Sequence, residues 1–219
     1  VIFKLHKTDT PPIRLVMEAG RRLHATSYAE ENPAEPPAFC MALRKYLRGA
    51  WVAGIDQYEF ERIVTVSFRT KTGLLKLVVE LFGEGNIILT NEQNVIIHAL
   101  VFKKMRDRDI LHNVVLELPP SSGKNPFKVT QSELEEALRN AGDVEVVRPL
   151  ARFLGVGGVY AEEILLRANV DKTKPCKALT SDEVKGIFGA LQTLLAAVSG
   201  GNLEACIVLG EDGDFVDVV

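Results

Sequence analysis

The chain has 219 residues, of which 47% are hydrophobic and 25% are charged, and its net charge is −3 at pH 7. This composition is typical of a globular protein with a sizeable core in one or two domains. It excludes a protein that binds nucleic acid through bulk positive charge, so any basic surface must be local.

The first part of the chain, to about residue 118, is rich in the β-branched residues that strands prefer. Strands are predicted over residues 1–6, 13–19, 22–28, 61–68, 74–82, 87–90 and 95–102, and the last four form an antiparallel meander. One helix is predicted over residues 37–48, with Pro37 in its first turn and Gly49 after its last. Its buried stripe comprises Phe39, Leu43, Tyr46 and Leu47.

A linker over residues 119–126 separates this part from a helical part that extends to about residue 201. Capping-box patterns at 130–133 and 180–183 open two of its helices. Ile187, Leu191, Leu194 and Val198 form the apolar face of the second of these helices. Residues 202–219 are predicted to begin a further β element with a hairpin. The fold class is therefore α+β. Because the chain begins and ends inside predicted strands, we expect it to be part of a longer protein.

The loop formed by Gly155, Val156, Gly157 and Gly158 lies between two short apolar-periodic segments. Leu150 and Leu154 are spaced for one helix face, and Tyr160, Ile164 and Leu165 for another. Glycines allow left-handed backbone angles and the close approach of another backbone. A helix that starts after such a loop directs unpaired N–H groups outward, as a phosphate seat requires. The pattern fits a helix-hairpin-helix module that holds a nucleic-acid backbone through Gly155, Gly157 and Gly158, and it equally fits an ordinary tight turn.

Basic side chains are distributed along the chain, and guanidinium groups bind phosphate bidentately. The candidates for RNA contact are Arg21, Arg22, Arg44, Lys45, Arg48, Arg62, Arg106 and Arg108. Two alternatives stay open. Arg44, Lys45 and Arg48 also suit the negative end of the helix dipole, and Arg106 to Asp109 also suit a solvated loop with internal salt bridges.

The sequence contains no legible catalytic or metal-binding set. The four histidines are scattered, and no Walker loop, HxxxH or GxSxG motif occurs. Cys40, Cys176 and Cys206 are far apart and odd in number, which predicts neither a disulfide framework nor a metal knuckle and suits a reducing compartment. No apolar run reaches the roughly 20 residues of a membrane span. We therefore expect no enzyme activity, no cofactor, no small-molecule substrate and no membrane partner.

Several segments in order resemble the N-terminal domain of archaeal members of the NFACT family, which are ribosome-associated quality-control factors once labelled fibronectin-binding protein A. They are EAGRRLH, ENPAEPPAFCMALRKYLRGA, FERIV, VVELFGEGNIILTN, MRDRD, ELPPSSGKNPF and LARFLGVGGVYAEEILLRA. The resemblance covers nearly the whole chain. It implies a β-rich module followed by a helix-hairpin-helix module, similar in architecture to formamidopyrimidine-DNA glycosylases.

The resemblance also implies a function. Family members bind a large ribosomal subunit blocked by peptidyl-tRNA and recruit aminoacyl-tRNA for untemplated C-terminal tailing of the stalled peptide, in the cytoplasm. The family's Asp-Arg pair tied to tRNA use falls on Glu61 and Arg62, where Glu keeps the charge and moves it outward by one methylene. Two alternatives are a DNA-binding, glycosylase-like protein of the same architecture and a fibronectin-binding adhesin.

Overall fold

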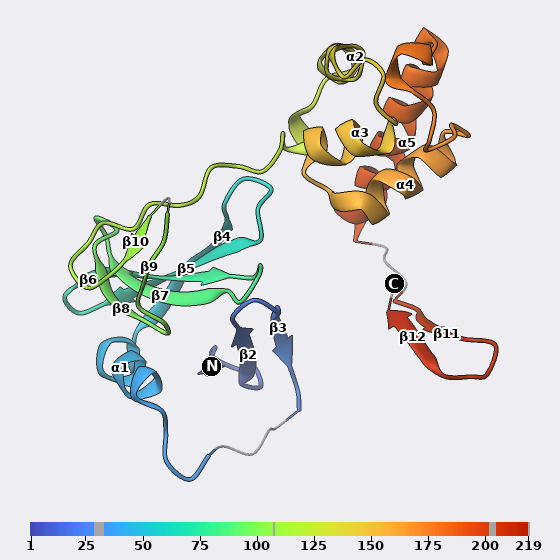
Figure 1. The fold of residues 1–219 in the computed structure, drawn as a ribbon. Helices are drawn as coiled ribbons and strands as arrows, with labels where there is room; N and C mark the ends of the chain where they lie inside the picture. The colour runs from blue at the N-terminus through green and yellow to red at the C-terminus, as the bar shows by residue number, and fades with distance from the viewer. Residues whose placement is uncertain (29–32, 107, 202–204, 219) are drawn as a thin grey trace. The chain divides into compact units, whose positions relative to one another are not determined.

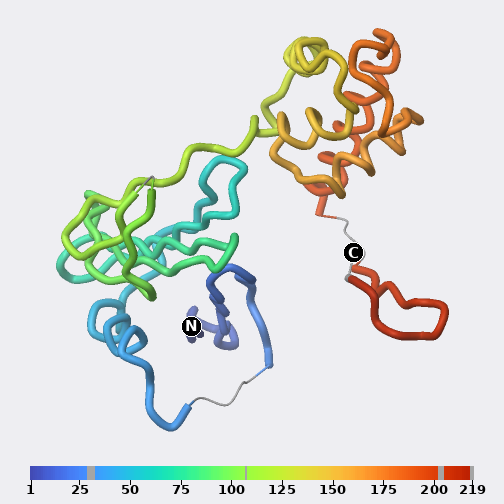
Figure 2. Tube along the Cα trace, viewed as in Figure 1, coloured from blue at the N-terminus to red at the C-terminus, as the bar shows by residue number. Residues whose placement is uncertain are grey.

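A computed structural model describes residues 1–28, 33–106, 108–201 and 205–218 (Figures 1 and 2). Asp107 of the predicted charged loop and residues 202–204 and 219 of the predicted C-terminal element lie outside these ranges. The chain forms two compact units, Val1–Ser121 and Ser122–Val219.

The first unit contains two main antiparallel sheets. The three-stranded sheet has the order β1 (Ile2–Leu5), β2 (Ile13–Glu18) and β3 (Arg22–Thr26). The five-stranded sheet is a meander of β4 (Trp51–Gln57), β5 (Ile63–Thr70), β6 (Gly73–Glu80), β7 (Asn86–Asn91) and β8 (Ile96–Ala99). A short hairpin of β9 (Lys103–Lys104) and β10 (Asp109–Ile110) follows. The predicted strands are confirmed, and so is the α+β class.

Both faces of the meander are covered by apolar side chains. On one face, helix α1 (Ala38–Leu47) and β2 bury Phe39, Leu43 and Met17 against the sheet. On the other face, Ile63, Val78, Ile88 and Ile96 pack against residues that follow β8, among them Ile110 and Leu116. Because neighbouring residues of β6 and β7 are buried on opposite faces, these strands read as continuous apolar runs rather than as alternating ones.

Strand β4 was missed by the sequence analysis. It is an edge strand, paired only with β5, and every residue except Gly54 is exposed. The register with β5 shifts between Val52 and Gly54, which leaves Ala53 as a bulge. An exposed edge strand with a bulge has no two-residue apolar alternation, so the periodicity from which strands are predicted is absent.

In the second unit, the residues that the structure describes form four helices, two 3-10 turns and a hairpin. These are η1 (Pro126–Lys128), α2 (Gln131–Asn140), α3 (Val147–Leu154), α4 (Gly157–Arg167), η2 (Cys176–Ala178), α5 (Ser181–Gly200), β11 (Ile207–Leu209) and β12 (Phe215–Val218). Leu150, Leu154, Ile164 and Leu165 are buried as predicted. Two predictions of buried faces were wrong: Tyr160 is 57% exposed and Val198 is half exposed, so the buried stripe of α5 runs through Val184, Ile187, Leu191 and Leu195 instead.

Both predicted capping boxes form. The Thr130 side chain accepts from the backbone N–H of Glu133, and the Glu133 carboxylate accepts from the backbone N–H of Thr130. Thr180 and Glu183 repeat the arrangement at the start of α5. Each box satisfies backbone N–H groups that have no partner within the helix, which is why the sequence pattern locates these helix starts so closely.

Glu133 of the first capping box, which is also paired with Lys124, makes the stability of this unit depend on pH. The hydrogen bond from Lys124, then those from the Thr130 backbone and hydroxyl, lower the pKa of Glu133 from 4.5 to about 2. A carboxyl whose pKa is lower in the folded state stabilises the fold above its unfolded pKa, and this contribution is lost as pH falls from about 4.5 to about 2. An NMR titration should find the Glu133 midpoint near 2, and Glu133→Gln should flatten the stability profile across that window. A midpoint near 4.5 would contradict the box in solution. Glu136→Gln, on the same helix, is the matched control.

Candidate nucleic-acid interface

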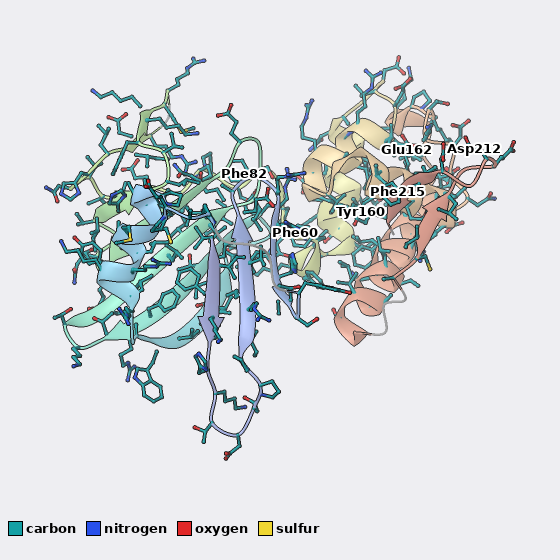
Figure 3. All side chains as sticks on the ribbon, turned by 90° about the horizontal axis from the view of Figure 1, so that it is seen from below. Phe60, Phe82, Tyr160, Glu162, Asp212 and Phe215 are labelled. Carbon is teal, nitrogen blue, oxygen red and sulfur yellow. The ribbon has the colours of Figure 1, made fainter. Side chains whose placement is uncertain are left out.

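Three turns of the first unit meet at one end of its sheets. The backbone N–H of Gly20, in the β2–β3 turn, donates to Glu80 O at 2.9 Å, and the N–H of Leu81 donates to Arg62 O at 2.8 Å. The three turns are residues 19–22, 58–62 and 80–85, which we call the turn junction. Figure 3 labels Phe60 and Phe82, one from each of two of these turns. Backbone hydrogen bonds therefore join turns that lie far apart in the sequence.

Glycines allow the turns to approach this closely. Gly85 has φ +64°, and a Cβ built there would lie 1.9 Å from Gly20 N. A Cβ on Gly20, which has φ +73°, would lie 2.4 Å from Gly83 O. No side chain fits at either contact, since the neighbouring atoms belong to the backbone. Gly20 of EAG and Gly85 of FGEG are thus required by the junction itself.

Arg21 and Arg22 extend from the first of these turns. Arg21 Nη1 is 3.0 Å from Glu18 Oε1, and Arg22 Nε is 2.7 Å from Glu18 Oε2. Hydrogen bonds from Arg22 and then Arg21 lower the pKa of Glu18 below its usual value. The two guanidinium groups therefore share the Glu18 carboxylate. Exposed pairs of this kind are weak, and the Arg21 guanidinium has further donors to offer a phosphate.

The pair Glu61 and Arg62 lies in the second turn. Gln57 Nε2 donates to Glu61 O at 2.9 Å, and Ser121 Oγ donates to Glu61 Oε1 at 3.0 Å. These bonds, with that from Tyr58 N to Ile63 O at 2.9 Å, hold the turn in one conformation. Arg62 is exposed and forms no ion pair with any residue in the described ranges. Arg62 thus lies in the same set of hydrogen-bonded turns as Arg21 and Arg22, and its side chain is exposed.

The other predicted basic residues lie elsewhere. Arg44 and Lys45 are in the last turn of α1, and Arg48 caps that helix, all exposed and all just before β4 begins. Arg62 follows the other end of β4, and at about 3.3 Å per residue the strand separates the two ends by roughly 20 Å. Arg106 is exposed in the loop between β9 and β10. The eight candidates therefore do not form one continuous patch.

The structure overturns the RNA-binding prediction for Arg108. Its side chain is only 4% exposed, and Nη1 lies 2.7 Å from Oε1 of Glu80, whose side chain is 2% exposed. Arg108 Nη1 also donates to Glu117 O at 3.4 Å. A guanidinium buried in this way cannot reach a phosphate. It instead ties the loop after β8 to the end of β6, directly beneath the turn junction.

In the glycine loop of the second unit, Gly155 contacts another backbone segment, whereas Gly157 and Gly158 do not. Gly155 ends α3 with φ +64°, and the backbone of Gly123 packs closely against it. A Cβ built on Gly123 would lie only 2.4 Å from Gly155 N. Lys124 N donates to Phe153 O at 2.6 Å in the same contact. The prediction that Gly155 seats a ligand phosphate is therefore wrong, since the chain itself occupies that side. Gly157, with φ +78°, and Gly158 have no atom within 4 Å of a built Cβ, and Val156 gives α4 no side-chain cap. Whether α3 and α4 form a helix-hairpin-helix module stays a prediction.

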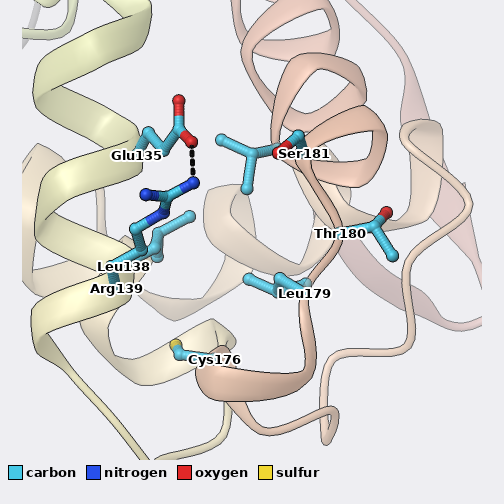
Figure 4. A pocket seen from close by; sticks show the side chains of 8 residues that line it. Glu135, Leu138, Arg139, Cys176, Leu179, Thr180 and Ser181 are labelled. Carbon is cyan, nitrogen blue, oxygen red and sulfur yellow. Dashed lines mark hydrogen bonds and ion pairs between the residues drawn. The ribbon is translucent and has the colours of Figure 1, made fainter.

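A pocket between α2 and α5 offers little room for a ligand (Figure 4). Its volume is about 20 Å³, enough for about one water molecule. Arg139 Nη2 is paired with Glu135 Oε1 at 2.5 Å beside it, and burial raises the pKa of the Cys176 thiol.

Within the described ranges, no three His, Cys, Asp or Glu side chains are placed to hold a metal ion. Nor is any described helix long and apolar enough to cross a membrane.

One exposed aromatic residue was not identified from the sequence. Trp51, at the start of β4, is 80% exposed, and its partner across the strand pair is Arg69. The signal that could have found it is composition, since this is the single tryptophan of the chain and it follows the basic end of α1.

Comparison with known proteins places these features in context. The family model NFACT_N, described as NFACT N-terminal and middle domains, matches residues 1–218. The Archaeal Rqc2 homolog aRqcH of Methanocaldococcus jannaschii is 37% identical over 225 residues, which cover 100% of this chain and 33% of that protein. The human Ribosome quality control complex subunit NEMF is 27% identical over 195 residues, covering 87% of this chain and 18% of that protein.

A solved structure shares the fold. The fibrinogen binding protein from Staphylococcus aureus superposes with a TM-score of 0.71 at 20% identity, over 97% of this chain and 80% of that one. The chain spans about a third or less of the length of these two curated relatives.

Proposed function

The chain belongs to the NFACT family, and from this we propose that it is the tRNA-contacting part of a cytoplasmic ribosome-associated quality-control factor. The names of its relatives, an Rqc2 homolog and a subunit of a ribosome quality control complex, support that role. In this proposal the whole protein binds a large ribosomal subunit that carries peptidyl-tRNA. It recruits aminoacyl-tRNA for untemplated tailing of the stalled peptide. This chain binds and positions RNA and catalyses no reaction.

The observation that carries the proposal is the exposed Arg62 at the turn junction, which also includes Arg21 and Arg22. Arg62 would bind a tRNA phosphate bidentately, and the two other arginines would add further contacts. Glu61 is held by Ser121 and has the role of fixing the turn that presents Arg62. Its longer side chain, compared with the Asp of the family pair, is accommodated by that hydrogen bond.

The start of α4 is the second element of the proposal. Its first N–H groups lie at the positive end of the helix dipole, and Gly157 and Gly158 leave the approach to them open. A sugar-phosphate backbone could therefore come within hydrogen-bond distance of these amides without meeting a side chain. In this proposal the second unit holds RNA independently of base sequence, and the first unit holds it through arginines.

The decisive test is the salt dependence of tRNA binding. Arg62→Ala should weaken binding by roughly 10- to 100-fold, because a hydrogen-bonded charge pair with a phosphate is lost. It should also lower the slope of log affinity against log salt by about 0.7 to 0.9, the value for one phosphate contact. Arg139→Ala is the matched control, since Arg139 is exposed in α2 and already paired with Glu135.

Unchanged affinity and slope for Arg62→Ala would reject the assignment of this residue. The role of the whole protein needs a separate measurement, namely co-sedimentation of the full-length protein with large ribosomal subunits and sequencing of the RNA that it carries. Absence of the full-length protein from the large-subunit fraction would reject the proposed role.

A further inference from the structure

The start of β4 carries a surface that the turn junction does not use. Trp51 is 80% exposed there and contributes to none of the three apolar cores. Arg69 lies directly across from it on β5, so the two side chains share one face of the sheet. Trp51, Val52, Ala53 and Arg69 line a hollow of about 400 Å³. An aromatic ring, an arginine and open space are thus combined at one point.

The chain segments around Trp51 carry positive charges and no negative ones. Residues 44–55 and 66–76 contain no Asp or Glu, although the whole chain has 29 acidic and 26 basic residues. The two segments lie side by side, because β4 pairs with β5 and α1 ends just before β4. Their basic residues are Arg44, Lys45, Arg48, Arg69, Lys71 and Lys76.

The charged side chains on the elements that neighbour Trp51 differ in whether they are already engaged. Lys76, on β6, is engaged by Glu92 O at 3.0 Å and Asn94 Oδ1 at 2.9 Å. Arg48, Arg69 and Lys71 form no ion pair with residues in the part of the chain that the structure describes. The first carboxylate along β4 is Asp56, five residues beyond Trp51 and directed at Gly54. Arg69, across the strand pair from Trp51, and Arg48, three residues before it, are therefore available to an anion.

We infer that Trp51 stacks an unpaired base of single-stranded or loop RNA while Arg69 and Arg48 hold the adjacent phosphates. Stacking requires an exposed aromatic face, and phosphate binding requires unneutralised cations beside it; both are present here. A duplex would not bind at this site, because its bases are already stacked on one another. The inference rests on the proposed function and adds a second contact, roughly 20 Å from Arg62 along β4.

The single tryptophan makes the site directly observable. Titration of the chain with a short single-stranded oligoribonucleotide should quench the fluorescence of Trp51, whereas a blunt duplex of equal charge should not. Trp51→Ala should weaken binding of the single strand by about 5- to 150-fold, and Trp51→Phe should retain most of it. Because Trp51 is exposed, neither substitution removes core packing. Tyr28→Ala, which removes another highly exposed aromatic side chain of the same unit, is the matched control.

The outcomes are separable from those of the Arg62 experiment. Equal quenching by duplex and single strand, or unchanged single-strand binding by Trp51→Ala, would overturn the inference while leaving Arg62-dependent tRNA binding intact. If the chain binds no RNA at all, the proposed function fails as well. A fluorescence response to an acidic peptide but to no RNA would also overturn the inference and assign the free edge of β4 to a protein partner.

Discussion

Arg108→Ala is expected to lower the free energy of unfolding by about 3–5 kcal/mol, the range for removal of one partner from a buried ion pair. The substitution would leave the Glu80 carboxylate buried without its cation, at a position where water cannot reach it. The loop after β8 would also lose its attachment to the end of β6. Urea denaturation followed by circular dichroism measures the change.

Two further variants isolate the cause. Arg106→Ala removes an exposed arginine from the same loop and should change stability by no more than about 0.5 kcal/mol. The double variant Arg108→Met with Glu80→Leu replaces the pair by apolar side chains and should recover most of the loss. Equal effects of Arg108→Ala and Arg106→Ala would show that the buried pair contributes nothing to stability in solution.

Arg108 also marks where sequence reasoning reached its limit. In MRDRD two arginines alternate with two aspartates, and nothing in the local sequence distinguishes Arg106, which is exposed, from Arg108, which is buried. The distinction depends on Glu80, 28 residues earlier in the chain. A long-range partner of this kind leaves no periodic signal, so charge alone assigns both arginines to the surface.

Local signals, in contrast, predicted the elements well. Thr130 with Glu133 and Thr180 with Glu183 located two helix starts, because a capping box is formed by residues three apart. The core strands were found because burial imposes a pattern on their residues. Strand β4 was missed since it is an exposed edge, and Trp51 was missed with it.

The candidate site could be predicted only in part. Glu61 and Arg62 were found through the family resemblance, and Arg21 and Arg22 through their charge, but their convergence could not be read from the sequence. It results from the contact of Gly20 with Gly85. The sequence around either glycine does not indicate that the two residues are in contact. The same holds for Gly123 and Gly155 in the second unit, where the close approach that the glycine loop predicted is made by the chain itself.

Because the turn junction depends on glycine, Gly85→Ala should damage both the fold and the RNA contact. A methyl group there would lie 1.9 Å from Gly20 N and 2.4 Å from Glu80 O, and backbone atoms held by a hydrogen bond cannot yield. The positive φ adds about 1–2 kcal/mol of strain, and loss of the Gly20–Glu80 hydrogen bond adds about 1–3 kcal/mol. The free energy of unfolding should therefore fall by about 2–5 kcal/mol.

Gly83→Ala separates backbone strain from the contact between turns. Gly83 has φ +55° in the same turn, but no atom lies within 4 Å of a built Cβ, so only the strain of about 1–2 kcal/mol applies. Under conditions where both variants remain folded, tRNA affinity and its salt slope should fall for Gly85→Ala and stay near the original values for Gly83→Ala. This follows because the first substitution displaces the turn that carries Arg21 and Arg22, and the second does not. If the two variants bind tRNA equally well, the arginines do not act together, and the junction supports the fold alone.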